Sequence, residues 1–159
     1  MSATTDYRDP WISPRIKISA LWASLLLVFV YVDLFGLYRA DVRADIEAGR
    51  IAGAAIDQVF LLGITAYVAL PSLLVFLSLV LPVRVQRTAS IVLAVLYAIT
   101  IAGSAVGEWG YFILGSVLEV ALLAGIVYHA LTWPKATEGA ATQDRASAPP
   151  SDTGPRQGG

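Results

Sequence analysis

Four apolar stretches, each close to 20 residues long, constrain what this chain can fold into. They cover residues 18 to 38, 59 to 81, 89 to 106 and 111 to 131. A helix rises 1.5 Å per residue, so about 20 apolar residues cross the ~30 Å hydrocarbon core of a bilayer. The pattern therefore predicts an all-α protein, a four-helix transmembrane bundle.

The composition agrees with a membrane environment and excludes several kinds of chemistry. Charged residues make up 14% of the chain, whereas about 25% is ordinary for a soluble domain. With no cysteine and a single histidine, His129, the chain cannot perform thiol chemistry or build a bis-His haem site within one subunit. A net charge of -1 offers no basic surface for nucleic acid. We expect a protein that is not an enzyme, needs no cofactor and has the lipid bilayer as its main partner.

Basic residues are distributed unevenly between the two sides of the predicted bundle. Eight of them precede the first helix, follow the fourth helix or lie in the second loop. The other three lie in the first loop. Lys and Arg are retained on the cytoplasmic side, so both termini are predicted to be cytoplasmic. Arg15 and Lys17 precede the first stretch as in a signal peptide, but that stretch is too long and no small-residue cleavage site follows it directly.

The segments outside the four helices differ from them in composition. Residues 1 to 14 are predicted to be a flexible N-terminal segment and residues 15 to 133 the membrane domain. Residues 134 to 159, rich in Pro, Gly, Ala, Ser and Thr, are predicted to be a disordered tail. The first loop, "RADVRADIEAGRIAGAAID", mixes both charges with apolar positions. It fits equally a short amphipathic helix on the outer surface and an ordinary solvated loop.

Three local motifs carry a resemblance to a known family. They are "KISALWASLLLVFVYVDLFGLY", "PSLLVFLSLVLPVRVQR" and "YFILGSVLEVALL" followed by "WP". Over residues 15 to 135 the chain resembles an uncharacterised bacterial family of small four-helix membrane proteins, known as a domain of unknown function. The resemblance implies an integral protein of the bacterial cytoplasmic membrane, and it implies no activity, substrate or catalytic residue.

Glu119 interrupts an otherwise apolar run, "LGSVLEVALLAG", at residues 114 to 125. In a helix over residues 111 to 131 it lies ~3 Å from the midplane. A charge there costs about 3 kcal/mol, while the apolar residues of the helix return roughly 3 to 6 kcal/mol on insertion. The helix still inserts, but the side chain must face the bundle, either protonated or paired. Helical periodicity predicts that Glu108, Gly115 and Glu119 line one stripe.

Further polar residues gather in the half of the bundle that is predicted to lie nearer the outside. They are Tyr31, Asp33, Thr65, Tyr67, Thr100 and Ser104. They suggest a polar cavity closed towards the cytoplasm by Leu74, Leu122 and Ile126. The candidate proton or substrate site consists of Glu119, Asp33, Tyr31, Glu108, Tyr67, Thr100 and Ser104. The alternative is that the hydroxyls bond helix to helix, and that Asp33 simply reaches the membrane interface.

Two features of the backbone bear on packing. Pro71 cannot donate an amide hydrogen, so a kink and a free carbonyl at Tyr67 are predicted in the second helix. Ala94, Ala98 and Ala102 recur every fourth residue in the third helix, a pattern that allows close helix packing. This face packs within the bundle or against a second copy, which leaves a homo-oligomer through the third helix open.

Two functions fit these features. The first is a small transporter or channel-like protein in which Glu119 switches protonation or holds a cation or a cationic substrate. The second is a non-catalytic membrane module, such as a partner subunit or a lipid-binding or sensory protein, in which the carboxyl is purely structural. The sequence names no substrate for either.

Overall fold

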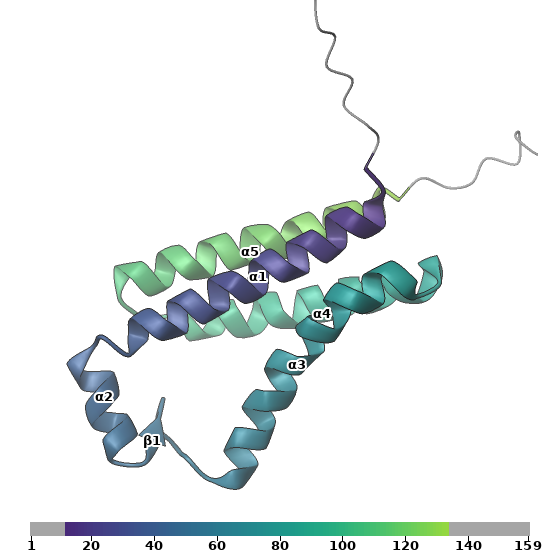
Figure 1. Cartoon of the computed structure of the whole chain (residues 1–159). Helices are drawn as coiled ribbons and strands as arrows, with labels where there is room; N and C mark the ends of the chain where they lie inside the picture. The colour runs from purple at the N-terminus through teal and green to yellow at the C-terminus, as the bar shows by residue number, and fades with distance from the viewer. Residues whose placement is uncertain (1–11, 134–159) are drawn as a thin grey trace, which may run out of the picture.

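Four long helices make up most of the computed structural model, which describes residues 12–133 (Figure 1). Each is long and apolar enough to cross a membrane. The predicted all-α architecture with four such helices is therefore confirmed. The tail predicted for residues 134 to 159, and most of the predicted N-terminal segment, lie outside the described residues. The four helices are α1 (Pro14–Gly36), α3 (Gln58–Val80), α4 (Val83–Ser104) and α5 (Gly110–Leu131).

The observed boundaries differ most from the predicted ones where α4 begins. The helix starts at Val83, directly after Pro82, and not at residue 89. Its first two turns carry Arg84, Gln86 and Arg87. Because these residues are polar, the apolar run begins later than the helix does. A proline just before the first helical residue is a common helix start.

The first loop contains regular structure. Of the two interpretations the helix is observed, as α2 (Ala40–Glu47), and all its residues are at least partly exposed. A small antiparallel hairpin follows, formed by β1 (Arg50–Ile51) and β2 (Ala54–Ala55). The sequence analysis missed this hairpin because strands of two residues show no alternating pattern.

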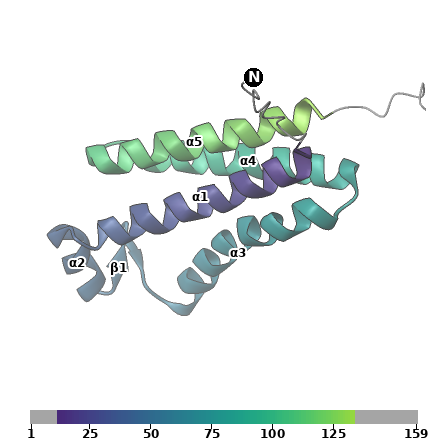
Figure 2. The ribbon, with the colours of Figure 1, turned by 45° about the horizontal axis from the view of Figure 1, so that its top comes forward.

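The four helices pack in the spatial order α3, α1, α5, α4, so that α1 lies between α3 and α5 (Figure 2). Contacts between α3 and α4 are few. The hydrophobic core lies along the inner faces of α1, α4 and α5, and α3 contributes Leu74. Its buried residues are Ile18, Trp22, Leu25, Leu74, Ala94, Tyr97, Ile101, Leu123, Ile126 and Ala130.

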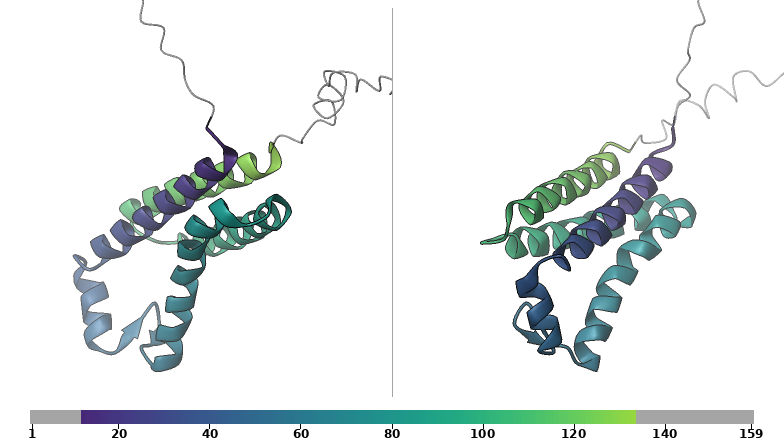
Figure 3. Two further views of the ribbon diagram at one scale, coloured as in Figure 1. Left: turned by 45° about the vertical axis from the view of Figure 1, so that its right-hand side comes forward. Right: turned by 60° about the vertical axis from the view of Figure 1, so that its left-hand side comes forward.

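The start of α1, the end of α5 and the α3–α4 connection lie at one end of the bundle, which we call the base (Figure 3). Side chains tie the helices together there. The Arg15 guanidinium donates hydrogen bonds to the carbonyls of Leu79 (2.9 Å) and Leu81 (2.8 Å). Arg87 donates to the carbonyl of Ala130 at 2.7 Å. The last carbonyl groups of a helix have no donor within that helix. The two arginines supply such donors and so connect neighbouring helices at the base.

The opposite end of the bundle, next to α2, is called the α2 end, and there α3 leaves its neighbours. Beyond Pro71, towards the base, α3 buries Leu74 and Ser78. Before Pro71 almost every residue is exposed, for example Val59 at 76%. Figures 1 and 3 show α3 changing direction along its length. A bend of α3 is therefore observed, as the kink predicted at Pro71 requires.

Candidate functional site

Glu119 lies on the buried face of α5, together with Gly115, Ser116, Leu123 and Ile126. The residue is 5% exposed. The prediction that it faces the bundle is therefore confirmed. Within the described part of the chain no hydrogen bond reaches its carboxyl group, although buried polar groups are nearly always paired. Glu119 is thus a sheltered carboxyl without a structural partner.

Groups on two other helices lie within electrostatic range of this carboxyl. Asp33 on α1 is close enough for its charge to act on Glu119, and the Tyr67 hydroxyl on α3 lies within range of both charges. The Asp33 side chain is exposed. The structure therefore brings together three of the predicted site residues, with one carboxyl buried and one open at the α2 end.

Tyr67 also connects α3 to α4 at the level of the kink. Its hydroxyl lies 2.9 Å from Thr100 Oγ1, and Thr100 Oγ1 in turn donates to the carbonyl of Tyr97 at 2.9 Å. The Tyr97 hydroxyl donates to the carbonyl of Tyr67. This is the carbonyl that Pro71 leaves without its helical donor. The predicted free acceptor exists, and a tyrosine of α4 occupies it.

Two predicted site residues face elsewhere. Tyr31 is two residues from Asp33, which places it about 200° around the helix. It lines an apolar groove of 270 Å³ between α1 and α5, together with Phe35 and Tyr111. Ser104 is exposed, and its hydroxyl donates to the carbonyl of Ile101 in its own helix at 2.9 Å. Neither belongs to the group around Glu119.

The stripe predicted for Glu108, Gly115 and Glu119 is wrong at Glu108. The helix begins at Gly110, and Glu108 belongs to the turn that follows Gly107, whose φ of 81° ends the preceding segment. Gly115 and Glu119 do share the buried face. The helical periodicity of α5 does not reach Glu108, because the turn at Gly107 has a positive φ that glycine adopts easily.

Glu108 instead pairs with a cation of the first loop. Arg39 Nη1 lies 2.8 Å from Glu108 Oε2, and its guanidinium stands 4.5 Å above the Trp109 ring. Arg39 also donates to Asp41, and this hydrogen bond lowers the pKa of the Asp41 carboxyl below its usual value. The same bond raises the pKa of Arg39, so the guanidinium stays charged. Arg39 thus joins the α1–α2 and α4–α5 connections.

The base was predicted to be closed by apolar packing, and this is only partly correct. Leu74 and Ile126 are buried as expected. Gln86 and Ser90 of α4 are also buried there, at 0% exposure each, together with the indole of Trp22. The sequence analysis missed both polar residues because they precede or begin the predicted apolar run. The buried residues of α4 recur every three or four positions, and this helical periodicity indicates that Gln86 and Ser90 share its buried face.

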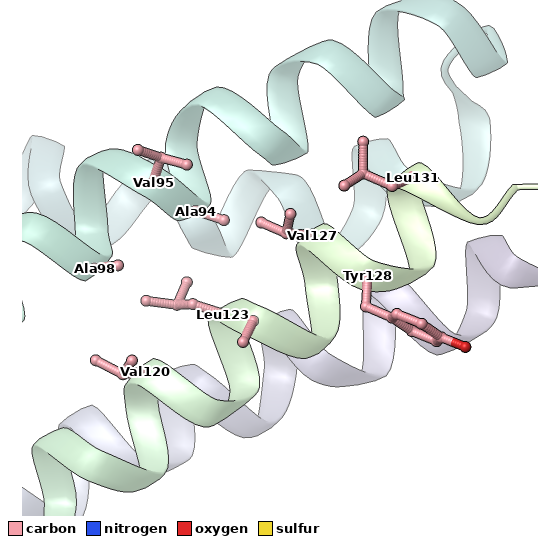
Figure 4. Close-up of a pocket in the computed structure, with 9 residues that line it drawn as sticks. Ala94, Val95, Ala98, Val120, Leu123, Val127, Tyr128 and Leu131 are labelled. Atoms are coloured by element: carbon pink, nitrogen blue, oxygen red, sulfur yellow. The ribbon is translucent and has the colours of Figure 1, made fainter.

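An apolar groove of 410 Å³ separates parts of α4 and α5 (Figure 4). Ala94 and Ala98 line it opposite Val120 and Leu123, whereas Ala102 is exposed. The first two alanines of the predicted packing pattern therefore face α5 of the same chain. This confirms packing within the bundle as a use of the pattern.

Four apolar helices around a sheltered carboxyl define a multi-pass membrane protein with a partly polar interior. Among the residues that the structure describes, no group of three or more His, Cys, Asp or Glu side chains is placed to hold a metal ion. The chain belongs to a family of unknown function, DUF6326, whose model matches residues 10 to 140. The resemblance to an uncharacterised family is thereby confirmed. No curated protein and no solved structure matches the chain.

Proposed function

We propose that this protein is a small transporter or channel-like protein in which the Glu119 carboxyl binds a proton or a cation. The observation that carries the proposal is the isolation of this carboxyl. The residue Glu119 is 5% exposed, and no hydrogen bond from the described residues reaches its carboxyl group. A carboxyl with a structural role would be expected to have donors around it, since unpaired burial is costly. Ionisable groups inside membrane proteins mark ion or proton pathways far more often than they serve packing.

The neighbouring groups support a cation or a proton as the ligand. Asp33 and Glu119 are both acidic and lie within electrostatic range of each other. Two carboxylates repel in a medium of low dielectric constant unless a positive charge lies between them. The Tyr67 hydroxyl adds a neutral oxygen within electrostatic range of both. Exposed Asp33 provides the entrance and Glu119 the inner binding group.

We place the access to such a site at the α2 end, where Asp33 is exposed. The half of α3 before Pro71 is exposed along almost its whole length. Its link to α4 is formed by the Tyr67, Tyr97 and Thr100 groups described above. Opening and closing of this half about Pro71 would change the route from solvent to Asp33, as broken helices do in transporters.

The same proposal includes the setting of the protein. We place both termini in the cytoplasm, because Arg15, Lys17, Arg84 and Arg87 gather at the base. The membrane is the cytoplasmic membrane of a bacterium, as the resemblance implies, and the bilayer is the main partner. The protein is not an enzyme. Exposed Ala102 on α4 is the position through which a second copy would approach.

One observation favours the second candidate function, a non-catalytic lipid-binding or partner module. The 410 Å³ groove between α4 and α5 is lined by apolar side chains apart from Tyr128. A groove of this kind accepts an acyl chain or an apolar helix without any use of Glu119.

Reconstitution in liposomes separates the two functions. The wild type and Glu119→Gln are compared for proton flux with an internal pH dye, and for flux of monovalent cations. Gln retains the size and hydrogen-bonding capacity of the side chain and removes its charge. We expect loss of flux with an unchanged melting temperature in detergent. Glu47→Gln, which alters an exposed glutamate of α2, serves as the control and should retain flux. Equal flux in wild type and Glu119→Gln would refute the proposed transport function.

A further inference from the structure

The base contains buried polar atoms that have no partner in the described part of the chain. They are Trp22 Nε1, both side-chain polar atoms of Gln86, and Ser90 Oγ. All three residues are 0% exposed. Unpaired buried polar atoms are rare in native proteins, and where they cluster they usually bind internal water.

Trp22 and Ser90 lie at similar depth, and Gln86 lies one helical turn nearer the base. Trp22 is eight residues into α1 and Ser90 seven into α4, so they lie about 12 Å and about 11 Å from the base, with Gln86 at about 5 Å. Gln86, Ser90 and Tyr97 belong to the same buried face of α4. The Trp22 ring meets the Tyr97 ring edge-on, with centroids 6.3 Å apart. Trp22 therefore faces the side of α4 that carries the two unpaired residues.

We propose that Trp22, Gln86 and Ser90 form a binding site for internal water, and that this hydrated site is the base-side half of a polar path to Glu119. The ligand is a small uncharged molecule that both donates and accepts hydrogen bonds. The indole supplies a donor, the amide supplies donors and an acceptor, and the hydroxyl supplies one of each. The site itself stands apart from the proposed transport function, whereas its place in a path rests on that function.

The spacing of polar groups along the bundle supports the path. By helical rise Glu119 lies about 18 Å from the base, and Ser116, whose buried hydroxyl is also unpaired, about 23 Å. Tyr97 lies at about 21 Å and Asp33 at about 29 Å by the same measure. Measured along the bundle axis alone, successive polar groups are separated by no more than about 6 Å, which is the axial length of one or two hydrogen-bonded waters.

Thermal stability distinguishes a hydrated site from a dry one by the sign of the change. In a dry site, Gln86→Leu removes an unpaired amide, and the melting temperature should rise. In a hydrated site, the same change removes the partners of the bound water and leaves Ser90 and Trp22 unpaired. We expect a fall of about 3 °C or more. Ser78→Ala is the matched control for Ser90→Ala, because the buried Ser78 hydroxyl is already satisfied by the carbonyl of Leu74 at 2.6 Å. Ser90→Ala should lower the melting temperature more than Ser78→Ala.

Fluorescence of Trp22 reports whether water is bound at the site, and it does so without changing Gln86 or Ser90. Trp11, Trp109 and Trp133 are replaced by Phe, which leaves Trp22 as the emitter. Exchange of H₂O for D₂O should increase its emission, since water bound to the indole quenches the excited state more than D₂O does. Gln86→Leu in this background should abolish the D₂O effect and shift the emission to shorter wavelength. Emission that is identical in H₂O and D₂O, or a higher melting temperature of Gln86→Leu, would overturn the inference.

The two proposals can fail separately. A D₂O effect at Trp22 combined with unchanged flux in Glu119→Gln supports the water site and refutes the transport function. Loss of flux in Glu119→Gln without a D₂O effect supports transport and refutes the water site. If both stand, Gln86→Leu should reduce proton flux relative to Ser78→Ala; equal flux in these two variants would remove the site from the path.

Discussion

The two ends of the bundle are built in different ways. At the base, Arg15 and Arg87 bond the last carbonyls of neighbouring helices, and Ile18 and Trp22 are fully buried. At the α2 end, the first half of α3 is exposed to its surroundings on nearly all sides. Within a bilayer, helices associate through packing and hydrogen bonds and not through removal from water. The buried residues of α1 and α3 are concentrated towards the base, whereas Asp33 is exposed at the α2 end.

Two isoleucines provide the largest expected contrast between these ends. Ile18 at the base is 0% exposed, and Ile64 in the first half of α3 is 43% exposed. Ile18→Ala should lower the free energy of unfolding by about 2 kcal/mol, because the packing contacts of the side chain are lost. The value is at the low end for such a change, since within a bilayer helix association gains nothing from removal of apolar surface from water. Ile64→Ala should change the free energy of unfolding by less than about 0.5 kcal/mol. Denaturant titration in mixed micelles measures both, and equal losses would contradict the division into a packed base and an open end.

The boundary between the two ends is tested by Tyr97. Tyr97→Phe removes the donor to the Tyr67 carbonyl and should cost about 1 kcal/mol. Pro71→Ala restores an amide donor to the same carbonyl. In that background Tyr97→Phe should therefore cost clearly less. The double-mutant cycle is followed by denaturant titration, and strict additivity would show that the tyrosine does not replace the missing helical bond.

The smallest expected effect concerns Arg39 at the α2 end. Its hydrogen bond lowers the pKa of the Asp41 carboxyl in the folded protein. The contribution of this pair to stability is complete above the ordinary pKa of aspartate, about 3.9, and is lost as the pH falls through the lower folded value. Hydrogen exchange of α2 should thus be independent of pH from 7 to about 5, after correction for the intrinsic rate, and lose protection only in stronger acid. The matched variant Asp41→Asn should abolish this transition; a loss of protection near neutral pH would contradict the assignment.

The sequence predicted the features that depend on local composition. Four apolar runs of spanning length predicted α1, α3, α4 and α5, because length and hydropathy alone decide whether a helix can cross a bilayer. The inward position of Glu119 followed from the cost of a carboxyl in lipid. The kink at Pro71 followed from its missing amide hydrogen.

The features that the sequence could not predict depend on contacts between distant segments. The pairing of Glu108 with Arg39 joins two connections that are 69 residues apart. The donor that fills the Tyr67 carbonyl comes from another helix. The burial of Gln86 and Ser90 depends on the helices that pack against this face of α4, and Gln86 also lies before the apolar run. Predicting each of these features requires the packing order of the helices, and hydropathy does not give that order.

The central claim is that Glu119 is an unpaired carboxyl, sheltered within the bundle and still accessible to a proton or cation. Labelling with an apolar carbodiimide, which reacts with protonated carboxyl groups in membranes, tests it directly when followed by mass spectrometry of the purified protein in lipid nanodiscs. We predict that Glu119 is modified, that added cation slows the modification, and that Glu108, which is paired with Arg39, reacts much less. An unmodified Glu119 beside a labelled Glu108 would contradict the account.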